Sequence, residues 1–160
     1  MTSKSEFDTV LSRILRLQED STVKIFGTDH KAVFMASYTT KHYPDDEYIK
    51  LFFADGTLLE IMPNEKEIFF CDDSRNEISR DLIIDDGKHL NIDGNLYTLE
   101  NSNDTQIIKK IYFGDITDGE GGCIFSDYVF EDEVWSLAKL ENGQISDVHA
   151  RKIGIKDLSL

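Results

Sequence analysis

One stretch in the first half of the chain, Tyr48–Asp73, restricts the fold more than any other. Apolar residues alternate there with other residues, as in a half-buried β-strand, at Ile49, Leu51 and Phe53. The Asp55-Gly56 dipeptide follows directly, and such dipeptides supply the positive φ angles of a two-residue hairpin turn. The chain is therefore predicted to turn back here and to continue as an antiparallel strand.

Two more strands complete this stretch, and a segment of similar sequence ends the chain. The return strand is predicted at Leu58–Met62, a break at Pro63-Asn64 and a third strand at Ile68–Cys71. In this final segment, Val134–Asp157, the dipeptide Asn142-Gly143 takes the place of the first turn. We therefore predict hairpins at both Asx-Gly turns, with topologically equivalent strands around them.

A shorter residue pattern is shared by the starts of the two halves. Val23–Gly27 and Leu90–Gly94 share the order apolar, any, apolar, any, Gly. We predict a mainly β (α+β) fold, in which one N-terminal amphipathic helix packs on antiparallel sheets or on a partly open barrel with internal duplication of a β-hairpin unit. The 160 residues suit a single domain, residues 1–160, with halves at 22–73 and 82–158. The alternative, that any antiparallel protein repeats such strands and turns, stays open.

The predicted helix covers Ser5–Glu19. Its apolar residues fall at helical spacing and form one stripe, Phe7, Val10, Leu11, Ile14 and Leu15. A stripe of this width is typical of a globular helix packed on its own sheet, so we predict that Phe7, Leu11 and Ile14 are buried. The alternative is an amphipathic helix that docks on a partner.

The net charge of −14 restricts the partners that the chain can have. It argues against nucleic acid, where cationic contacts to phosphate dominate binding, and against anionic lipid surfaces. A basic protein would be attracted. The N-terminal residues lack an apolar signal region, and no apolar run approaches the roughly 20 residues of a membrane-spanning helix. With Cys71 and Cys123 as the two cysteines, a disulfide framework is also not expected, so a cytoplasmic protein is predicted.

The residues that usually carry metal or nucleophilic chemistry are dispersed. No zinc-ligand spacing joins the histidines, which are interpreted as surface residues at His30, His42, His89 and His149. Cys123 follows two glycines and has acidic neighbours, which would raise its thiol pKa, so a buried structural role is favoured. We therefore predict no catalytic residue, no cofactor-binding residue and no metal site.

The most unusual loop of the sequence is acidic and rich in glycine. Three carboxylates, those of Asp115, Asp118 and Glu120, lie among three glycines. The residue order of a calcium-binding loop is absent. We predict that these carboxylates contact a protein partner, because binding residues are often located on loops. Trp135 is a further candidate for partner contact if it is exposed, although an aromatic pair across two strands with Tyr128 explains it equally well.

Several motifs resemble the bacterial domain-of-unknown-function family 4178. The run Asp46–Phe70 is similar to the central motif of that family, an acidic-aromatic start followed by a strand, Asp-Gly and another strand. Leu90–Leu99, Gly114-Asp115-Ile116 and Phe125–Leu158 resemble its later elements. The tryptophans of the family are replaced here by Tyr48 and by leucines. The resemblance implies a small β-rich domain without catalytic residues, in bacteria often encoded near membrane-stress genes.

Three functions are compatible with these observations. The leading hypothesis is a non-catalytic accessory or protein-binding domain of the bacterial cytoplasm, linked to membrane-stress genes and without a cofactor. An alternative is an acidic immunity-type inhibitor of a basic toxin, since opposite charges speed the encounter of two proteins. A second alternative is a divalent-cation-dependent enzyme that uses the acidic loop at residues 115–120.

Overall fold

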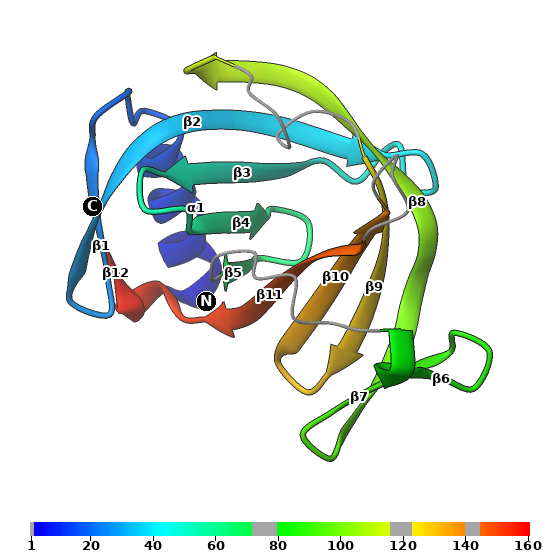
Figure 1. Ribbon diagram of the computed structural model, residues 1–160. Helices are drawn as coiled ribbons and strands as arrows, with labels where there is room; N and C mark the ends of the chain where they lie inside the picture. Colours follow the sequence, from blue (N-terminus) through cyan, green and yellow to red (C-terminus); the bar gives the residue numbers. More distant parts are fainter. Residues whose placement is uncertain (1, 72–79, 116–122, 140–144) are drawn as a thin grey trace.

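The computed structural model describes residues 2–71, 80–115, 123–139 and 145–160. Within these residues the protein is mainly β, as predicted, with one α-helix near the N-terminus (Figure 1). The helical elements are α1 (Thr2–Ile14) and two short 3₁₀ helices, η1 (Arg80–Leu82) and η2 (Ile155–Asp157). The strands are β1 (Thr22–Ile25), β2 (Thr28–Thr40), β3 (Tyr48–Phe53), β4 (Leu58–Met62), β5 (Glu67–Cys71), β6 (Ile83–Ile84), β7 (His89–Ile92), β8 (Asn95–Phe113), β9 (Ile124–Phe130), β10 (Glu133–Lys139), β11 (Ile145–Ile153) and β12 (Leu158–Ser159).

Eight of the strands close into an antiparallel barrel. Its order is β2-β3-β4-β5-β11-β10-β9-β8, and β8 pairs again with β2. Strands β1 and β12 extend the sheet beyond β2, while β7 and β6 extend it beyond β8. The helix α1 lies against the outside of the barrel, behind β3 and β4 in the view of Figure 1. The prediction of a helix packed on antiparallel strands is confirmed, and the barrel is closed rather than partly open.

Each half of the chain forms a five-stranded meander, β1–β5 and β7–β11, in which consecutive strands are neighbours. Both meanders begin with a two-residue hairpin loop, Phe26-Gly27 or Asp93-Gly94. The φ angles are 49° and 80° in the first loop and 51° and 84° in the second. Positive φ at both central residues is the geometry of a type I′ turn. The shared residue order of Val23–Gly27 and Leu90–Gly94 therefore marks equivalent hairpins.

The predicted equivalence of the two Asx-Gly turns is wrong. Asp55-Gly56 joins β3 to β4, the second and third barrel strands of its half. The antiparallel pairing of β10 with β11 is as predicted, but the Asn142-Gly143 turn between them lies outside the described residues. Strands β10 and β11 are the third and fourth barrel strands of the second half. The similarity between the sequences Tyr48–Asp73 and Val134–Asp157 therefore reflects only the pattern that any return strand shows after such a turn.

The loop at Asp55-Gly56 also has one residue more than predicted. Phe53 N–H donates to Thr57 O at 2.9 Å, and Gly56 N–H donates to Phe53 O at 3.1 Å, so three residues lie between the paired ends. Gly56 takes a φ of 89°, whereas Asp55 keeps a negative φ. The Asp55 carboxylate accepts from Thr57 N–H at 3.0 Å and from Thr57 Oγ1 at 2.6 Å. These bonds hold Asp55 in the geometry of a type I turn followed by a glycine bulge.

The helix begins and ends earlier than predicted. After Ile14 the backbone bonds tighten to the i→i+3 pattern, because Leu17 N–H donates to Ile14 O at 3.0 Å. Phe7 and Ile14 are 3% and 0% exposed, which confirms their predicted burial, whereas Leu11 is only half-buried. In the described residues, no helix has the length and apolar character that crossing a bilayer requires.

The main hydrophobic core lies between α1 and the outer face of the first meander. Directly opposed residues of antiparallel strands share one face of the sheet. Leu51, Leu59 and Phe70 are opposed in this way on β3, β4 and β5, and they pack with Phe7 and Ile14 of the helix. A smaller cluster covers the outer face of the second meander and consists of Leu90, Tyr97, Tyr128 and Leu137.

Candidate functional site

The opposite face of the same strands points into the barrel. Lys50 of β3 stands directly opposite Glu60 of β4, and Asp127 of β9 stands opposite Ser136 of β10. Lys50 and Glu60 both act on the pKa of Asp127, which shows that these residues share one interior. Tyr48 of β3 donates its hydroxyl to Gln106 Oε1 of β8 at 2.9 Å, although β2 lies between the two strands. The interior therefore carries charged residues from both meanders.

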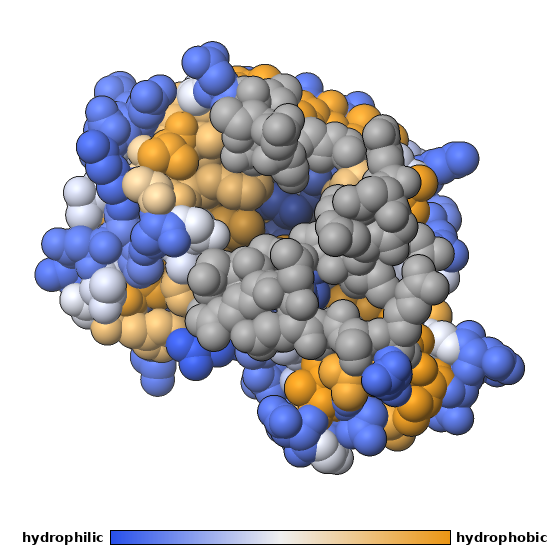
Figure 2. Space-filling model, viewed as in Figure 1, coloured by the Kyte–Doolittle hydropathy of each residue, from blue (hydrophilic) through white to orange (hydrophobic). Residues whose placement is uncertain are grey.

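Part of the interior is more exposed to solvent than the outer face of β3 and β4. Leu51, Leu59 and Ile61 on the outside of β3 and β4 are 0% exposed. Of their sequence neighbours on the inner face, Lys50, Phe52, Glu60 and Met62 are half-buried, whereas Leu58 is buried. Tyr38, Tyr48 and Cys71, which lie on the same inner face, are buried as well. Partial exposure extends to Phe69, Phe125, Asp127, Val134, Ser136 and Val148 on the inner face. Figure 2 shows a recess near the middle of the view, with hydrophilic residues at its floor and hydrophobic residues along one side.

Two tyrosines and one lysine form a stack in the interior. The rings of Tyr38 and Tyr48 are 5.7 Å apart and nearly parallel, at 21°. Lys50 Nζ lies 5.5 Å from the ring centre of Tyr38 and 5.9 Å from that of Tyr48, within the range of cation–π attraction. Burial, with the charge of Glu60 as the next cause, raises the pKa of the Tyr48 hydroxyl far above its ordinary value. Tyr48 therefore stays neutral and remains a donor to Gln106.

Among the described residues, no carboxylate lies within ion-pairing distance of the Lys50 ammonium group. In the described ranges, the lysines found within 4.0 Å of a carboxylate are Lys24, Lys31, Lys66 and Lys152. Although Glu60 is the cross-strand neighbour of Lys50, the two are not in ion-pairing contact. Lys50 and Glu60 are therefore available to a bound molecule.

Asp127 is the most perturbed carboxyl group of the interior. Its Oδ1 accepts a hydrogen bond of 2.5 Å from Ser136 Oγ. Burial, together with the negative charge of Glu60, raises the pKa of Asp127 to about 7, and the Ser136 bond and the Lys50 charge offset only part of this. At neutral pH this carboxyl group exists in both protonation states. Perturbed groups of this kind cluster at functional sites.

Asp104 shows what full hydrogen bonding does to a similar carboxyl group. It is 0% exposed, and it accepts from His42 N–H at 2.9 Å, Asn101 Nδ2 at 2.8 Å and Thr105 N–H at 2.8 Å. Burial alone would raise its pKa, but these hydrogen bonds, led by that of Asn101, lower the pKa below its ordinary value. Asp104 is thus a charged structural residue that ties β8 to the loop after β2.

Cys123 lies at the start of β9 and is half-buried, with a free thiol. Burial raises the pKa of this thiol, while Lys50 lowers it and Asp127 raises it further. The predicted direction of the shift is confirmed, although burial rather than acidic neighbours is its first cause. The thiol is therefore protonated at neutral pH and a poor nucleophile.

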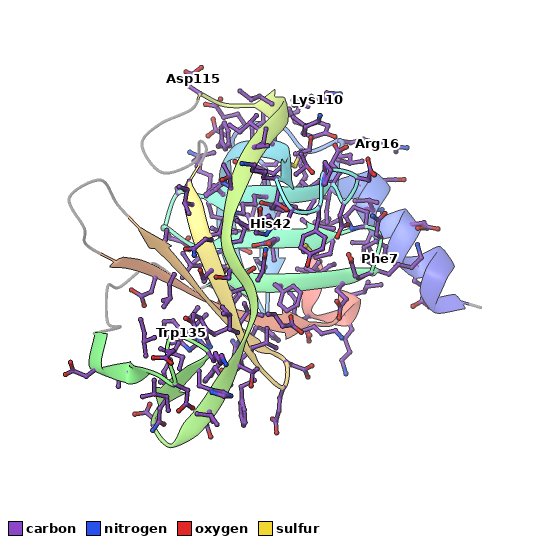
Figure 3. All side chains as sticks on the ribbon, turned by 90° about the vertical axis from the view of Figure 1, so that its right-hand side faces the viewer. Phe7, Arg16, His42, Lys110, Asp115 and Trp135 are labelled. Atoms are coloured by element: carbon purple, nitrogen blue, oxygen red, sulfur yellow. The ribbon has the colours of Figure 1, made fainter. Side chains whose placement is uncertain are left out.

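Of the predicted partner-contact residues, the structure describes Asp115 and Trp135, and it does not bring these two together. Asp115 is exposed just beyond the end of β8, whereas Asp118 and Glu120 lie outside the described residues. Trp135 lies near the opposite end of the molecule from Asp115 (Figure 3). It is half-buried, stands opposite Tyr128 as predicted, and stacks on His149 with ring centres 4.6 Å apart. Trp135 is thus only partly exposed, and its contact with a partner, like that of the acidic loop, stays a prediction.

The four histidines are dispersed, each beside its own carboxylate. The ion-pair distances are 2.6 Å for His30 and Asp55, 3.6 Å for His42 and Asp104, 2.8 Å for His89 and Asp85, and 2.8 Å for His149 and Glu133. His30 is only 7% exposed and lies against the rings of Phe53 and Phe70, so its prediction as a surface residue is wrong. In the part of the chain that the structure describes, no three potential metal ligands converge.

Sequence reasoning missed the interior residues altogether. Lys50, Glu60 and Asp127 each interrupt a strand of apolar residues, in YIKLFF, LLEIM and IFSDYVF. Alternation alone assigns such residues to a solvent-exposed face. A signal was nevertheless present, because the neighbouring positions on the same face hold large apolar residues such as Phe52 and Phe125 rather than further polar ones.

Comparison with known proteins gives no further assignment. No protein-family model matches the chain, and neither the curated proteins nor the solved structures contain a significant match. The resemblance to family 4178 therefore stays a prediction, and function has to be argued from the geometry of the barrel.

Proposed function

We propose that this protein is a non-catalytic binding protein that holds a small, partly apolar molecule inside its barrel. The observation that carries the proposal is the partial exposure of inner residues of β3 and β4, Lys50, Phe52 and Glu60, in contrast to the outer residues Leu51, Leu59 and Ile61 of the same two strands, which are 0% exposed. Ligand sites are typically concave and mostly apolar, with a few polar groups that fix the orientation of the ligand. The half-exposed phenylalanines, with Lys50, Glu60 and Asp127, match that description.

The chemistry of the interior supports binding rather than catalysis. The Cys123 thiol has a raised pKa, which makes it a weak nucleophile. Lys50 lies over two tyrosine rings and has no neighbouring base within bonding distance among the described residues. The expected setting in the bacterial cytoplasm is part of this proposal. Of the two alternatives from the sequence, the cation-dependent enzyme depends on the 115–120 loop, which lies mostly outside the described residues. The inhibitor of a basic toxin depends on the net charge, and no contact favours it.

A neutral fluorescent probe tests whether the interior binds ligands. N-phenyl-1-naphthylamine, whose emission rises in apolar surroundings, should bind the parent protein saturably with one site per chain. Val148→Trp places a large side chain on the half-exposed inner face of β11 and should abolish this binding. Ile107→Trp, on a β8 residue that is 43% exposed, is the matched control and should bind as the parent does.

Urea unfolding of both variants shows whether they remain folded. Because Val148→Trp could disturb the wall itself, the smaller change Ala138→Leu, also on the inner face, should weaken binding in a protein that keeps the parent stability. Undiminished probe binding by a folded Val148→Trp variant would contradict the proposal.

A further inference from the structure

We infer that the molecule bound inside the barrel is an organic cation, an apolar amine whose ammonium group is held by Glu60 and Asp127. This inference rests on the proposed function, since it names the ligand class of the same interior site. It is carried by the balance of charges on the inner face and by the aromatic groups around them.

Acidic groups outnumber basic ones among the described residues of the interior. Glu60 and Asp127 lie on opposite walls, on β4 and β9, and Lys50 is the one ammonium group between the walls. Lys152 on β11 is already paired with Glu67 at 2.6 Å and lies outside this balance. Setting Lys50 against Glu60 leaves Asp127, in its ionised form, as a carboxylate without compensation. A cation supplies the missing charge, whereas an anion would add to the excess.

The aromatic stack shows which head group this interior accommodates. The barrel already places an ammonium group over the rings of Tyr38 and Tyr48, at 5.5 and 5.9 Å. Attraction between a cation and aromatic rings strengthens as water is excluded. The half-exposed Phe52, Phe69 and Phe125 offer apolar surface to the rest of an amine, while the net charge of −14 attracts cations to the protein as a whole.

The protonation of Asp127 ties this binding to pH. Burial first, and then the charges of Glu60 on β4 and Asp104 on β8, raise the pKa of its carboxyl, while the Ser136 bond from β10 and the charge of Lys50 on β3 lower it, which leaves the pKa at about 7. A cation prefers the ionised form, so amine binding should tighten as the pH rises through 7 and should release a proton. An anionic ligand would show the opposite dependence.

Three probes that share one apolar body and differ in charge test the inference. They are 1-naphthylmethylamine, 1-naphthylmethanol and 1-naphthylacetate, with binding measured by their fluorescence and by calorimetry. At pH 8 we expect the amine to bind at least 10-fold more tightly than the alcohol, and the acetate most weakly. At pH 5.5 the preference for the amine should shrink several-fold.

Glu60→Gln keeps the shape of the side chain and should reduce amine affinity about 10-fold without changing alcohol affinity. Glu67→Gln is the matched control, because the Glu67 carboxylate is already paired with Lys152, and it should leave both affinities unchanged. Lys50→Met removes the internal ammonium and should raise amine affinity. Lys110→Met, at an exposed lysine 4.7 Å from the Tyr112 ring centre, should not.

The outcomes separate the inference from the proposed function. Equal binding of amine and alcohol, or tighter binding of the acetate, would overturn the cation while leaving an interior ligand site. An amine preference that survives Glu60→Gln would overturn the assignment to Glu60. If none of the three probes binds, both the ligand class and the binding function are contradicted.

Discussion

The two faces of the barrel wall differ in how they are filled, although the same strands form both. On β4, Leu59 points outward, is 0% exposed and packs in the core under α1. The next residue, Glu60, points inward and is half-exposed. Small eight-stranded barrels are often filled by their own inward-facing side chains or hold one small ligand. Here the packed core is on the outside, so the interior is not needed in full to hold the fold together.

This difference separates stability from binding along the sequence. Because side chains alternate between faces, adjacent residues of one strand have different roles. Outer residues of β3, β4 and β5 supply buried apolar area, at about 25 cal/mol per Å². Inner residues of the same strands supply charges and rings that a ligand can reach. Substitutions at consecutive positions should therefore have distinct consequences, and the following four predictions test that separation.

The largest effect is expected for a truncation on the outer face. Leu59→Ala should lower the free energy of unfolding by about 2–5 kcal/mol, because it leaves a cavity in a completely buried cluster. Phe69→Ala, at a half-exposed inner position of the adjacent β5, should cost clearly less despite its larger side chain. Urea unfolding measures both. Equal losses would mean that the interior is packed as tightly as the outer core.

The next effect concerns the seam that closes the wall. Gly114, just beyond β8, has a φ of 84°, and a Cβ there would lie 2.4 Å from Val33 O and 2.9 Å from Phe34 Cα. Gly94 has the same φ with no atom near a Cβ. Gly94→Ala should cost about 1–2 kcal/mol, the strain of a left-handed residue. Gly114→Ala should lower the free energy of unfolding by more than this and should also weaken probe binding. Melting curves measure the first effect and fluorescence the second. Equal losses of stability in the two variants would mean that the β2–β8 pairing accommodates the added Cβ.

A smaller effect of opposite sign is expected inside the barrel. The pKa of Asp127 is raised from 3.8 to about 7, so the folded state binds more protons than the unfolded state between these values, and stability falls as the pH rises across that window. Asp127→Asn removes this loss and should stabilise the protein by about 1 kcal/mol or more at pH 8. The gain should fade toward pH 4.

Asp104 provides the control for that measurement. Its pKa is lowered, so its ionised form contributes stability above pH 4 that is lost as the pH falls further. Asp104→Asn should therefore destabilise the protein at pH 7. Stability curves for both variants between pH 4 and 8 test the signs, and a loss of stability for Asp127→Asn at pH 8 would contradict the raised pKa.

The smallest effect is expected for Glu60→Gln. A half-buried group that forms no ion pair with the described residues contributes little, so stability should change by less than about 0.5 kcal/mol. Ligand binding should change at the same time. A large loss of stability would show that Glu60 belongs to the fold rather than to the binding site, and the separation of the two faces would fail.

Much of the fold could be predicted from local patterns. The alternation around Leu51 and Leu59 predicts antiparallel strands with one apolar face, and the glycines at 27 and 94 mark equivalent hairpins because a type I′ turn requires positive φ. The helix end was misplaced because Leu15 and Leu17 continue the apolar pattern while packing from a turn rather than from the helix. Local spacing does not distinguish these cases.

The candidate site could not be predicted in the same way. Whether Lys50 faces water or a barrel interior depends on closure of the wall by the β5–β11 and β2–β8 pairs, which join residues far apart in the chain. The pKa of Asp127 likewise depends on Glu60, which lies across the barrel rather than near it in sequence. Sequence spacing contains no information on either distance.

The closing pairs also determine the order in which the protein assembles. The register joins residues 68–71 to 150–153 and residues 35–40 to 106–113. Such non-local pairs slow folding, because loop entropy is lost before their contacts form. Strands β1–β5 and α1, in contrast, are adjacent in the chain and can form early, with β5 then an unpaired edge open to other chains. We expect barrel closure to be the slow step of folding and β5 to be the strand at which misassembly begins.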